Sequence, residues 1–105
     1  MNPATIYHRP LSEFAFATDG THYVFRLRTG KGEARSCRFF YADRAAMAPE
    51  LDFACLPMKK IREDRYFDWY EVRLETKLER IAYWFELSDG AETLCYFGDC
   101  YEMAG

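Results

Sequence analysis

The sequence is poor in the side chains on which most recognisable catalytic and metal sites depend. Its 105 residues include two histidines, one asparagine and no glutamine. It contains no CxxC pair, no phosphate-binding loop and no nucleophile elbow. His8 and His22 lie far from the cysteines in the sequence, which argues against a zinc site. We therefore expect no metal, no cofactor and no catalytic residue in this chain.

Long apolar runs and an excess of basic charge are also absent. No apolar stretch approaches the roughly 20 residues of a membrane-spanning helix. The opening residues, MNPATIYHRPLSE, lack the apolar centre of a signal peptide. The formal net charge is −3, whereas nucleic-acid binding needs a basic surface that neutralises phosphates. We therefore expect a cytoplasmic protein that binds neither membranes nor nucleic acids.

The cysteines are even in number, which invites a disulfide interpretation. They are Cys37, Cys55, Cys95 and Cys100. Because there is no secretory signal and disulfides persist mainly in oxidising compartments, free thiols are favoured. Cys37 and Cys95 lie in apolar strand contexts, where we expect cysteine to pack as a small hydrophobic side chain.

Apolar and aromatic residues are abundant, and their spacing predicts strands. They make up 50% and 18% of the chain, which is enough for the core of one domain. Side chains two apart line one face of a strand. Residues 66–98 therefore contain three predicted core stripes: Tyr70, Val72 and Leu74; Ile81, Tyr83, Phe85 and Leu87; and Leu94 and Tyr96.

A helix over part of this stretch is the alternative. Leu74, Leu78, Ile81 and Phe85 are spaced four, three and four residues apart, as on one face of a helix. Several residues between them are weak helix formers. The Asp89-Gly90 pair that follows is typical of a two-residue hairpin turn with a positive φ. The pattern favours strands and leaves the helix open.

The rest of the chain predicts short strands separated by turns. Residues 21–29 and 34–42 predict two strands joined by a hairpin turn at Gly30-Lys31-Gly32. The other expected elements are an edge strand at residues 6–8, a loop or one helical turn at 43–52, a short strand at 53–60 and a charged turn at 61–65. About eight short strands at this spacing indicate an all-β sandwich or barrel.

Some aromatic and basic side chains are predicted to point away from the core. They are Phe40, Phe67, Trp69 and Trp84, with Arg26, Arg28 and Arg38. Aromatic rings on a sheet surface either stack on sugar rings or lie under another domain. We expect the three arginines to line up across neighbouring strands, as a solvated face or as an interface. Three carboxylates lie close together in the sequence, as a catalytic pair could: Asp64, Asp68 and Glu71. We interpret them instead as part of a solvated strand end and turn.

The order of several motifs along the chain resembles a known family. The motifs are ATIYHRPLSEFAFA at 4–17, FRLRTGKGE at 25–33, FFYADR at 39–44, RYFDWYEVRLE at 65–75 and IAYWFELSDGAETLCYFG at 81–98. Together they resemble the N-terminal domain of cyclomaltodextrinases, neopullulanases and maltogenic amylases of the α-amylase superfamily. In that group the domain is classed as a family 34 carbohydrate-binding module.

The resemblance implies a fold and a parent enzyme. The fold would be an immunoglobulin-like antiparallel β-sandwich of about eight strands, with strands rather than a helix at residues 74–85. Residues 1–105 would be one accessory domain of a longer hydrolase that acts on cyclodextrins, pullulan or maltodextrins. The catalytic residues would lie in a C-terminal (β/α)8 barrel, where a retaining mechanism places two carboxyl groups about 5 Å apart.

The resemblance also implies partners and contact residues. The domain would mediate homodimerisation and narrow the partner's active-site cleft, with the loop after Asp43 near that cleft. Relatives commonly carry an aromatic residue where this chain has Ala45, and often a small or aliphatic one where it has Trp84. The candidate residues for contact with maltodextrin, cyclodextrin or a partner are Tyr41, Asp43, Arg44, Phe67, Trp69 and Trp84.

Overall fold

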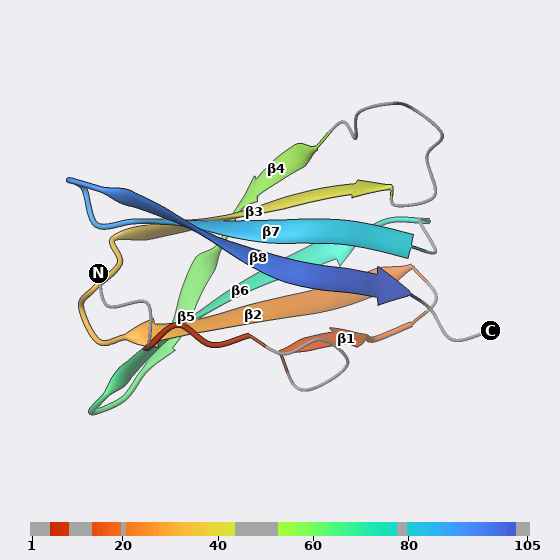
Figure 1. Cartoon of the computed structure of the whole chain (residues 1–105). Coiled ribbons are helices and arrows are strands. Elements are labelled where there is room, and N and C mark those ends of the chain that lie inside the picture. Colours follow the sequence, from red (N-terminus) through yellow and green to blue (C-terminus); the bar gives the residue numbers. More distant parts are fainter. Residues whose placement is uncertain (1–4, 9–13, 20, 44–52, 78–79, 103–105) are drawn as a thin grey trace.

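The computed structural model describes residues 5–8, 14–19, 21–43, 53–77 and 80–102, and the side chains of Arg80 and of residues 97–102 are not described (Figure 1). The described residues form eight strands. They are β1 (Ala15–Ala17), β2 (His22–Gly30), β3 (Ser36–Asp43), β4 (Ala54–Pro57), β5 (Lys59–Glu63), β6 (Phe67–Glu75), β7 (Arg80–Ser88) and β8 (Thr93–Glu102). No helix among these residues is long and apolar enough to cross a membrane.

The strands form two four-stranded sheets that pack face to face (Figure 1). One sheet has the order β1-β2-β6-β5 and the other β4-β3-β7-β8, and all neighbouring strands are antiparallel. This arrangement confirms the expected immunoglobulin-like sandwich of eight strands. It also decides the ambiguous stretch, because β6 ends at Glu75 and β7 runs from Arg80 to Ser88.

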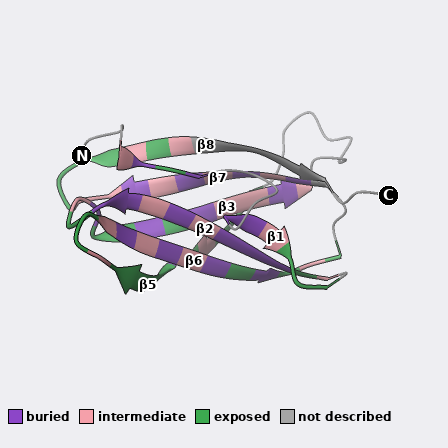
Figure 2. Ribbon diagram, turned by 90° about the horizontal axis from the view of Figure 1, so that it is seen from below, coloured by how far each residue is buried: buried purple, intermediate pink, exposed green. Residues whose placement is uncertain are grey.

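The core lies between the sheets and consists of the predicted stripes. Buried and less buried residues alternate along β6 and β7, as Figure 2 shows, and the same stripes run along β2 and β3 with interruptions at Val24 and Tyr41. The buried members are Tyr23, Phe25, Leu27, Cys37, Phe39, Tyr70, Val72, Leu74, Ile81, Tyr83, Phe85 and Leu87. Leu94 and Tyr96 of β8 are partly buried against them. Each large apolar side chain removed from water contributes about 1.5–3 kcal/mol, which makes this inner layer the main source of stability.

The segment after β2 is not the hairpin turn that the sequence predicted. β2 and β3 belong to different sheets, so Gly30-Lys31-Gly32 begins a crossing from one sheet to the other. Gly32 has a φ of 72°, a conformation that favours glycine, and its N–H donates to Asp68 Oδ2 at 2.8 Å. Alternation along a strand shows which side chains are buried but not which sheet the strand joins.

The turn between β7 and β8 is wider than predicted. Four residues, 89–92, separate the strands, whereas a two-residue turn was expected. The positive φ is confirmed at Gly90, where it is 96°. The Asp89 carboxylate accepts hydrogen bonds from the backbone N–H groups of Ala91 and Glu92, both at 2.8 Å. An aspartate that closes a turn in this way stabilises the longer loop.

Residues 53–65 contain two edge strands. β4 lies at the edge of one sheet, β5 lies at the edge of the other, and Met58 between them donates its N–H to the Cys37 carbonyl at 2.9 Å. The expected short strand within 53–60 is confirmed as β4, which ends at Pro57. Its extension to Lys60 is wrong, and β5 replaces most of the charged turn expected over 61–65. β5 carries lysine and arginine side chains and an irregular register between Lys60 and Arg62. Both features discourage unwanted edge-to-edge pairing.

The cysteines for which the structure describes a side chain are free thiols. Cys37 is 2% exposed, as predicted, and burial raises its pKa to about 12. Cys55 and Cys95 are exposed. The prediction that Cys95 packs as a core residue is wrong, because Cys95 pairs with Glu86 on the outward side of the sheet. The Cys100 side chain lies outside the described residues.

The N-terminal segment is tied to both sheets by Tyr7 and His8. Tyr7 exchanges two backbone hydrogen bonds with Arg28, at 2.8 and 3.0 Å. The edge strand predicted at residues 6–8 is thus a single β-bridge. His8 Nδ1 lies 2.8 Å from the Arg26 carbonyl oxygen of β2, and Nε2 lies 2.8 Å from the Tyr83 hydroxyl of β7. Because a carbonyl only accepts, we assign the proton to Nδ1, so that Tyr83 donates to Nε2. Burial lowers the pKa of His8, and the hydrogen bond to the Arg26 carbonyl only partly opposes this effect. The lowered pKa keeps the ring neutral.

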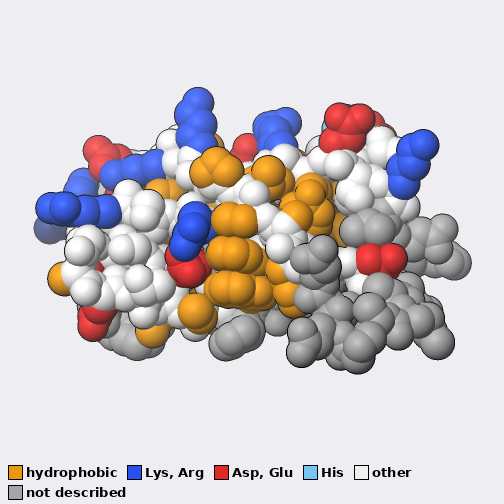
Figure 3. Space-filling model, turned by 90° about the horizontal axis from the view of Figure 1, so that it is seen from above, with side chains coloured by type: hydrophobic (Ala, Val, Ile, Leu, Met, Phe, Trp, Pro, Cys, Tyr) orange, Lys and Arg blue, Asp and Glu red, His pale blue; other side chains and the backbone are white. Residues whose placement is uncertain are grey.

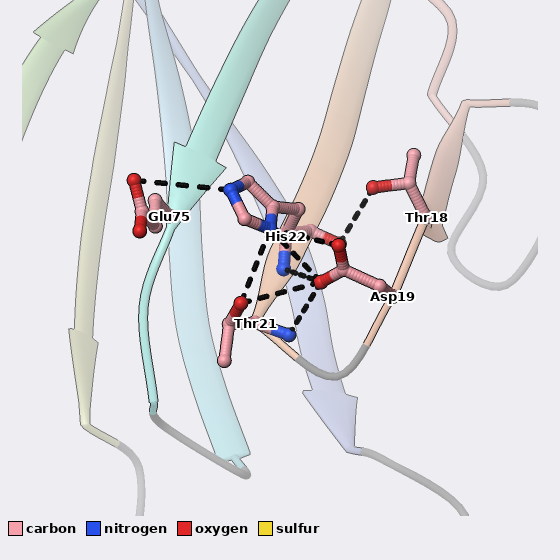
Figure 4. Close-up of polar contacts among 5 residues, drawn as sticks. All are labelled: Thr18, Asp19, Thr21, His22 and Glu75. Carbon is pink, nitrogen blue, oxygen red and sulfur yellow. Dashed lines mark hydrogen bonds and ion pairs between the residues drawn. The ribbon is translucent and has the colours of Figure 1, made fainter.

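The second histidine has the opposite environment. His22 begins β2 and lies between Asp19 and Glu75, which come from the preceding turn and from the end of β6 (Figure 4). Its Nδ1 is 2.9 Å from Asp19 Oδ1, and its Nε2 is 3.8 Å from Glu75 Oε2. The bond to Asp19 raises the pKa of His22. Backbone N–H donation from Thr21, followed by the bond from His22, lowers the pKa of Asp19 to about 2.

Replacing His8 with phenylalanine should destabilise the domain in a pH-dependent way. We expect the free energy of unfolding to fall by about 1–3 kcal/mol at neutral pH, because the hydrogen bonds of the imidazole with the Arg26 carbonyl and the Tyr83 hydroxyl are lost. Since the folded-state pKa of His8 lies below 6.5, its contribution is complete above that pH and is lost as the pH falls toward the folded-state pKa. Urea unfolding of the wild type and His8→Phe from about pH 8 to about pH 5 measures the difference.

His22→Gln is the control, since its effect on stability should change with pH in the opposite direction. The pKa of His22 is raised above 6.5, so its contribution is complete below that pH and is lost as the pH rises through the folded-state pKa. A destabilisation by His8→Phe that stays constant over this pH range would contradict the assignment of a neutral buried His8.

Candidate functional site

The predicted contact residues fall in separate places rather than in one site. Tyr41 and Asp43 lie at the end of β3, and Arg44 lies outside the described residues. Phe67 and Trp69 are half-buried on β6, in the β1-β2-β6-β5 sheet. Trp84 is half-buried on β7, in the other sheet, so it lies on the opposite side of the sandwich. Outward aromatic rings therefore form two surfaces, one on each sheet.

Arg28 organises the surface on the β1-β2-β6-β5 sheet. Its guanidinium carbon lies 4.0 Å from the ring centroid of Phe67, 4.9 Å from that of Tyr7 and 5.8 Å from that of Trp69. A guanidinium held against ring faces gains cation–π attraction, while its stem covers apolar surface. We call Tyr7, Arg28, Phe67 and Trp69 the arginine–aromatic cluster.

Asp64 holds Trp69 in place from the turn between β5 and β6. Its Oδ1 accepts the backbone N–H groups of Tyr66 and Phe67, at 2.9 and 2.8 Å, and its Oδ2 lies 3.3 Å from Trp69 Nε1, which donates to it. These backbone N–H groups lower the pKa of Asp64 by stabilising its charged form. The polar edge of the indole is thus fixed by the turn.

A groove runs beside Trp69. Phe14, Arg26, Ile61, Arg62 and Trp69 line it, and its volume is about 160 Å³. The rings of Phe14 and Trp69 stack with centroids 5.5 Å apart, and the guanidinium of Arg62 lies 5.5 Å from the Trp69 centroid. An aromatic wall with guanidinium donors beside it suits a sugar, whose apolar ring face stacks while its hydroxyls accept hydrogen bonds.

The three neighbouring carboxylates do not form a pair. Asp64 closes its turn, and Glu71 accepts hydrogen bonds from Arg26 and Arg73 at 2.9 and 3.0 Å. Burial alone would raise the pKa of Glu71, but these two guanidinium groups hold it below its ordinary value. Glycosidase chemistry needs one carboxyl group kept protonated, whereas the hydrogen bonds that Asp64 and Glu71 accept outweigh burial and favour the charged form of both.

Asp68 corrects the view of this region as a solvated strand end. Its side chain is 1% exposed. The Gly32 N–H donates to Oδ2, and Lys60 Nζ lies 3.3 Å from Oδ1, as an ion pair rather than a well-aligned hydrogen bond. Asp68 therefore joins β5 and β6 to the segment that crosses between the sheets. Within the described part of the chain, no group of three or more potential metal ligands occurs.

The other surface is apolar. Figure 3 shows hydrophobic side chains gathered in the middle of one face of the molecule. On the β4-β3-β7-β8 sheet, the rings of Phe40 and Trp84 stack with centroids 4.0 Å apart and planes 5° apart, and the Phe53 ring contacts Trp84 at 6.4 Å. We call these three residues the aromatic stack. Arg38 and Glu86 form an ion pair in the adjacent row.

The predicted row of three arginines is wrong. Arg26 and Arg28 lie on β2, whereas Arg38 lies on β3 in the other sheet. The sequence interpretation also missed Tyr7, Phe53 and Arg62 as surface contacts and the buried Phe14 as the ring that stacks on Trp69. They meet their partners across strands from different parts of the chain, and single-strand periodicity carries no signal for that.

The sequence and the fold are both similar to those of known proteins. Residues 1–102 match the family described as the α-amylase N-terminal Ig-like domain. The chain is 34% identical over 94 residues to neopullulanase 2 from Thermoactinomyces vulgaris, an alignment that covers 90% of this chain and 16% of that protein. It is 31% identical over 104 residues to an intracellular maltogenic amylase from Bacillus subtilis, covering 93% of this chain and 17% of that protein.

A solved structure of a cyclomaltodextrinase has the same fold. It superposes with a TM-score of 0.80 at 26% sequence identity, covering 100% of this chain and 18% of the other. The chain thus spans less than a fifth of the length of each of these relatives. The match over nearly all of the chain confirms the resemblance seen in the motifs.

Proposed function

Because the chain belongs to the family of α-amylase N-terminal Ig-like domains, we propose that it is the non-catalytic N-terminal domain of an α-glucan hydrolase. The enzyme would act on cyclodextrins, pullulan or maltodextrins, the substrate class that the names of the relatives indicate. The observation that carries the proposal is the match of residues 1–102 to a domain type defined by its place in such enzymes.

In this proposal residues 1–105 are one accessory domain, and the chemistry lies in a C-terminal barrel. Two carboxyl groups of that barrel, about 5 Å apart, would perform retaining hydrolysis. The enzyme would be cytoplasmic, in keeping with a relative that is named as intracellular. The domain would mediate homodimerisation and narrow the active-site cleft, and so favour small or cyclic substrates.

Deleting residues 1–105 from the complete gene product tests the proposal. We expect the shortened enzyme to hydrolyse soluble starch but to lose its preference for β-cyclodextrin, with the ratio of the two kcat/KM values changing by on the order of tenfold. Sedimentation velocity should show a monomer where the complete enzyme is a dimer. The isolated 105-residue chain should hydrolyse neither substrate.

The complete enzyme carrying Arg73→Met, a change at an exposed side chain on β6, should behave as the wild type. A deletion that leaves both the kcat/KM ratio and the dimer unchanged would refute a role in cleft shape and assembly. A complete gene product without α-glucan hydrolase activity would refute the proposal as a whole.

A second candidate function is direct sugar binding, favoured by the groove beside Trp69. The half-buried indole of Trp69, backed by Phe14, and the exposed guanidinium group of Arg62 suit a glucose ring. The domain would then hold a maltodextrin or cyclodextrin on the β1-β2-β6-β5 sheet while the barrel acts on it.

Tryptophan fluorescence decides this second candidate. In the 105-residue chain that carries Trp84→Phe, Trp69 is the sole tryptophan. Titration with β-cyclodextrin should change its emission, because the sugar would cover the indole. Trp69→Phe is the matched control, in which Trp84 should not respond. An unchanged emission of Trp84→Phe at millimolar sugar would rule out binding in the groove.

A further inference from the structure

The guanidinium of Arg28 lacks the acceptor that its neighbours on the β1-β2-β6-β5 sheet have. Arg26 donates a hydrogen bond to Glu71 at 2.9 Å, and Lys60 pairs with Glu63 at 3.0 Å. Within the part of the chain that the structure describes, no oxygen is hydrogen-bonded to the Arg28 guanidinium, and its Nε is also buried. Buried donors are nearly always hydrogen-bonded, so this exception calls for a physical explanation.

Aromatic rings hold this guanidinium in place. Its carbon lies 4.0 Å from the Phe67 centroid and 4.9 Å from the Tyr7 centroid, and Trp69 lies directly opposite Arg28 in the register of β2 and β6. Cation–π contacts stabilise the charge, but ring faces offer no oxygen acceptor to the N–H groups. A group that is already fixed loses little entropy when it binds a ligand. The arginine–aromatic cluster therefore presents a positioned cation with unused hydrogen-bond donors.

A second guanidinium lies against the same indole. The Arg62 guanidinium carbon is 5.5 Å from the Trp69 centroid, and the Arg62 side chain is 66% exposed. Its ion pair with Asp64 is long, at 3.9 Å, which exceeds hydrogen-bond distance. Trp69 and Arg62 also line the groove of about 160 Å³. Arg28 and Arg62 thus place two cationic donors beside one half-buried indole.

We propose that this surface binds a phosphate monoester of a sugar, with the phosphate on Arg28 and Arg62 and the sugar ring against Trp69. A phosphate monoester carries a charge of about −1.5 to −2 at neutral pH and three acceptor oxygens, which matches two guanidinium groups. The apolar face of a sugar ring stacks on an indole. Because one oxygen joins the phosphate to the sugar, the two parts occupy adjacent positions, as Arg28 and Trp69 do.

A sugar that carries a carboxylate, or no charge, fits this surface less well. A carboxylate brings one negative charge to two guanidinium groups, and neutral hydroxyls accept weaker hydrogen bonds than charged oxygens do. The neighbouring carboxylate of Glu71 already accepts hydrogen bonds from Arg26 and Arg73, so its charge is compensated. The ligand differs in class from the α-glucans of the proposed function, and the inference does not rest on that function. Such a site would let the domain respond to a phosphorylated metabolite.

Calorimetric titration of the 105-residue chain with glucose 1-phosphate tests the inference. Glucose, glucuronate and inorganic phosphate serve as comparison ligands, since each lacks one part of the probe. At low ionic strength we expect the Kd for glucose 1-phosphate to be at least about tenfold lower than the Kd for each of the other three. Binding should strengthen as the pH rises from about 5 to about 7.5, because the second pKa of a phosphate monoester is about 6 and the dianion forms over this range.

Three variants separate a positioned guanidinium from general electrostatic attraction. Arg28→Met should raise the Kd for glucose 1-phosphate by about tenfold or more. Arg28→Lys keeps the charge but loses the planar pair of donors, so its Kd should lie between those of the wild type and Arg28→Met. Arg73→Met, at a side chain on β6 that is 75% exposed, removes the same charge from the same sheet and should leave the Kd unchanged. Urea unfolding shows whether each variant is folded.

The comparison of ligands on the wild type decides even where Arg28→Met does not fold. A preference for glucose 1-phosphate over all three comparison ligands supports the inference. Equal affinity for glucuronate would assign the surface to carboxylates, and equal affinity for inorganic phosphate would remove the sugar from the recognition; either result overturns the proposal. Absence of binding at millimolar glucose 1-phosphate, or an equal loss of affinity in Arg73→Met and Arg28→Met, overturns it as well.

Discussion

The structure depends on a cluster of aromatic rings that fills the space between the sheets. Phe25 of β2 lies 4.6 Å from Phe39 of β3 and 4.8 Å from Tyr83 of β7, and Phe85 completes the cluster 5.6 Å from Phe39. Tyr83 also donates a hydrogen bond to the buried, neutral His8. Through its contacts with Arg26 and Tyr83, His8 attaches the N-terminal segment to both sheets. Because these rings occupy the inner faces, the alternate positions on the same strands, such as Phe40 and Trp84, face outward.

The two outer faces differ in the side chains they present, and each therefore suits a different kind of ligand. On one, a guanidinium held among rings adjoins a groove with hydrogen-bond donors, and charges of both signs surround it. On the other, stacked rings lie beside an internally neutralised ion pair. The first suits a soluble, polar ligand or solvent. The second suits a protein surface, which fits a domain that occupies less than a fifth of the length of its relatives.

Much of the fold could be predicted from the sequence, because period-two alternation of large apolar residues identifies strands and their buried faces. The stripes on β2, β6 and β7 and the buried Cys37 were predicted in this way. Sheet membership could not be, since alternation is the same whichever neighbour a strand has. Arg38 and the Gly30–Gly32 crossing were misplaced for that reason. Cys95 was misplaced for another: alternation with the inward Leu94 and Tyr96 already places it on the outward face. For the candidate site, Trp69 and Trp84 were identified as outward, but their partners were not: Phe40 meets Trp84 through cross-strand register, and Phe14 reaches Trp69 from the residue before β1.

We propose above that this chain is the accessory domain of an α-glucan hydrolase and that the chemistry lies elsewhere in the same polypeptide. The most direct test is to sequence the gene downstream of the codon for Gly105. We expect an open reading frame that encodes a (β/α)8 barrel with the paired carboxylates of a retaining glycosidase. A stop codon at this point, or a downstream domain of another kind, would contradict it.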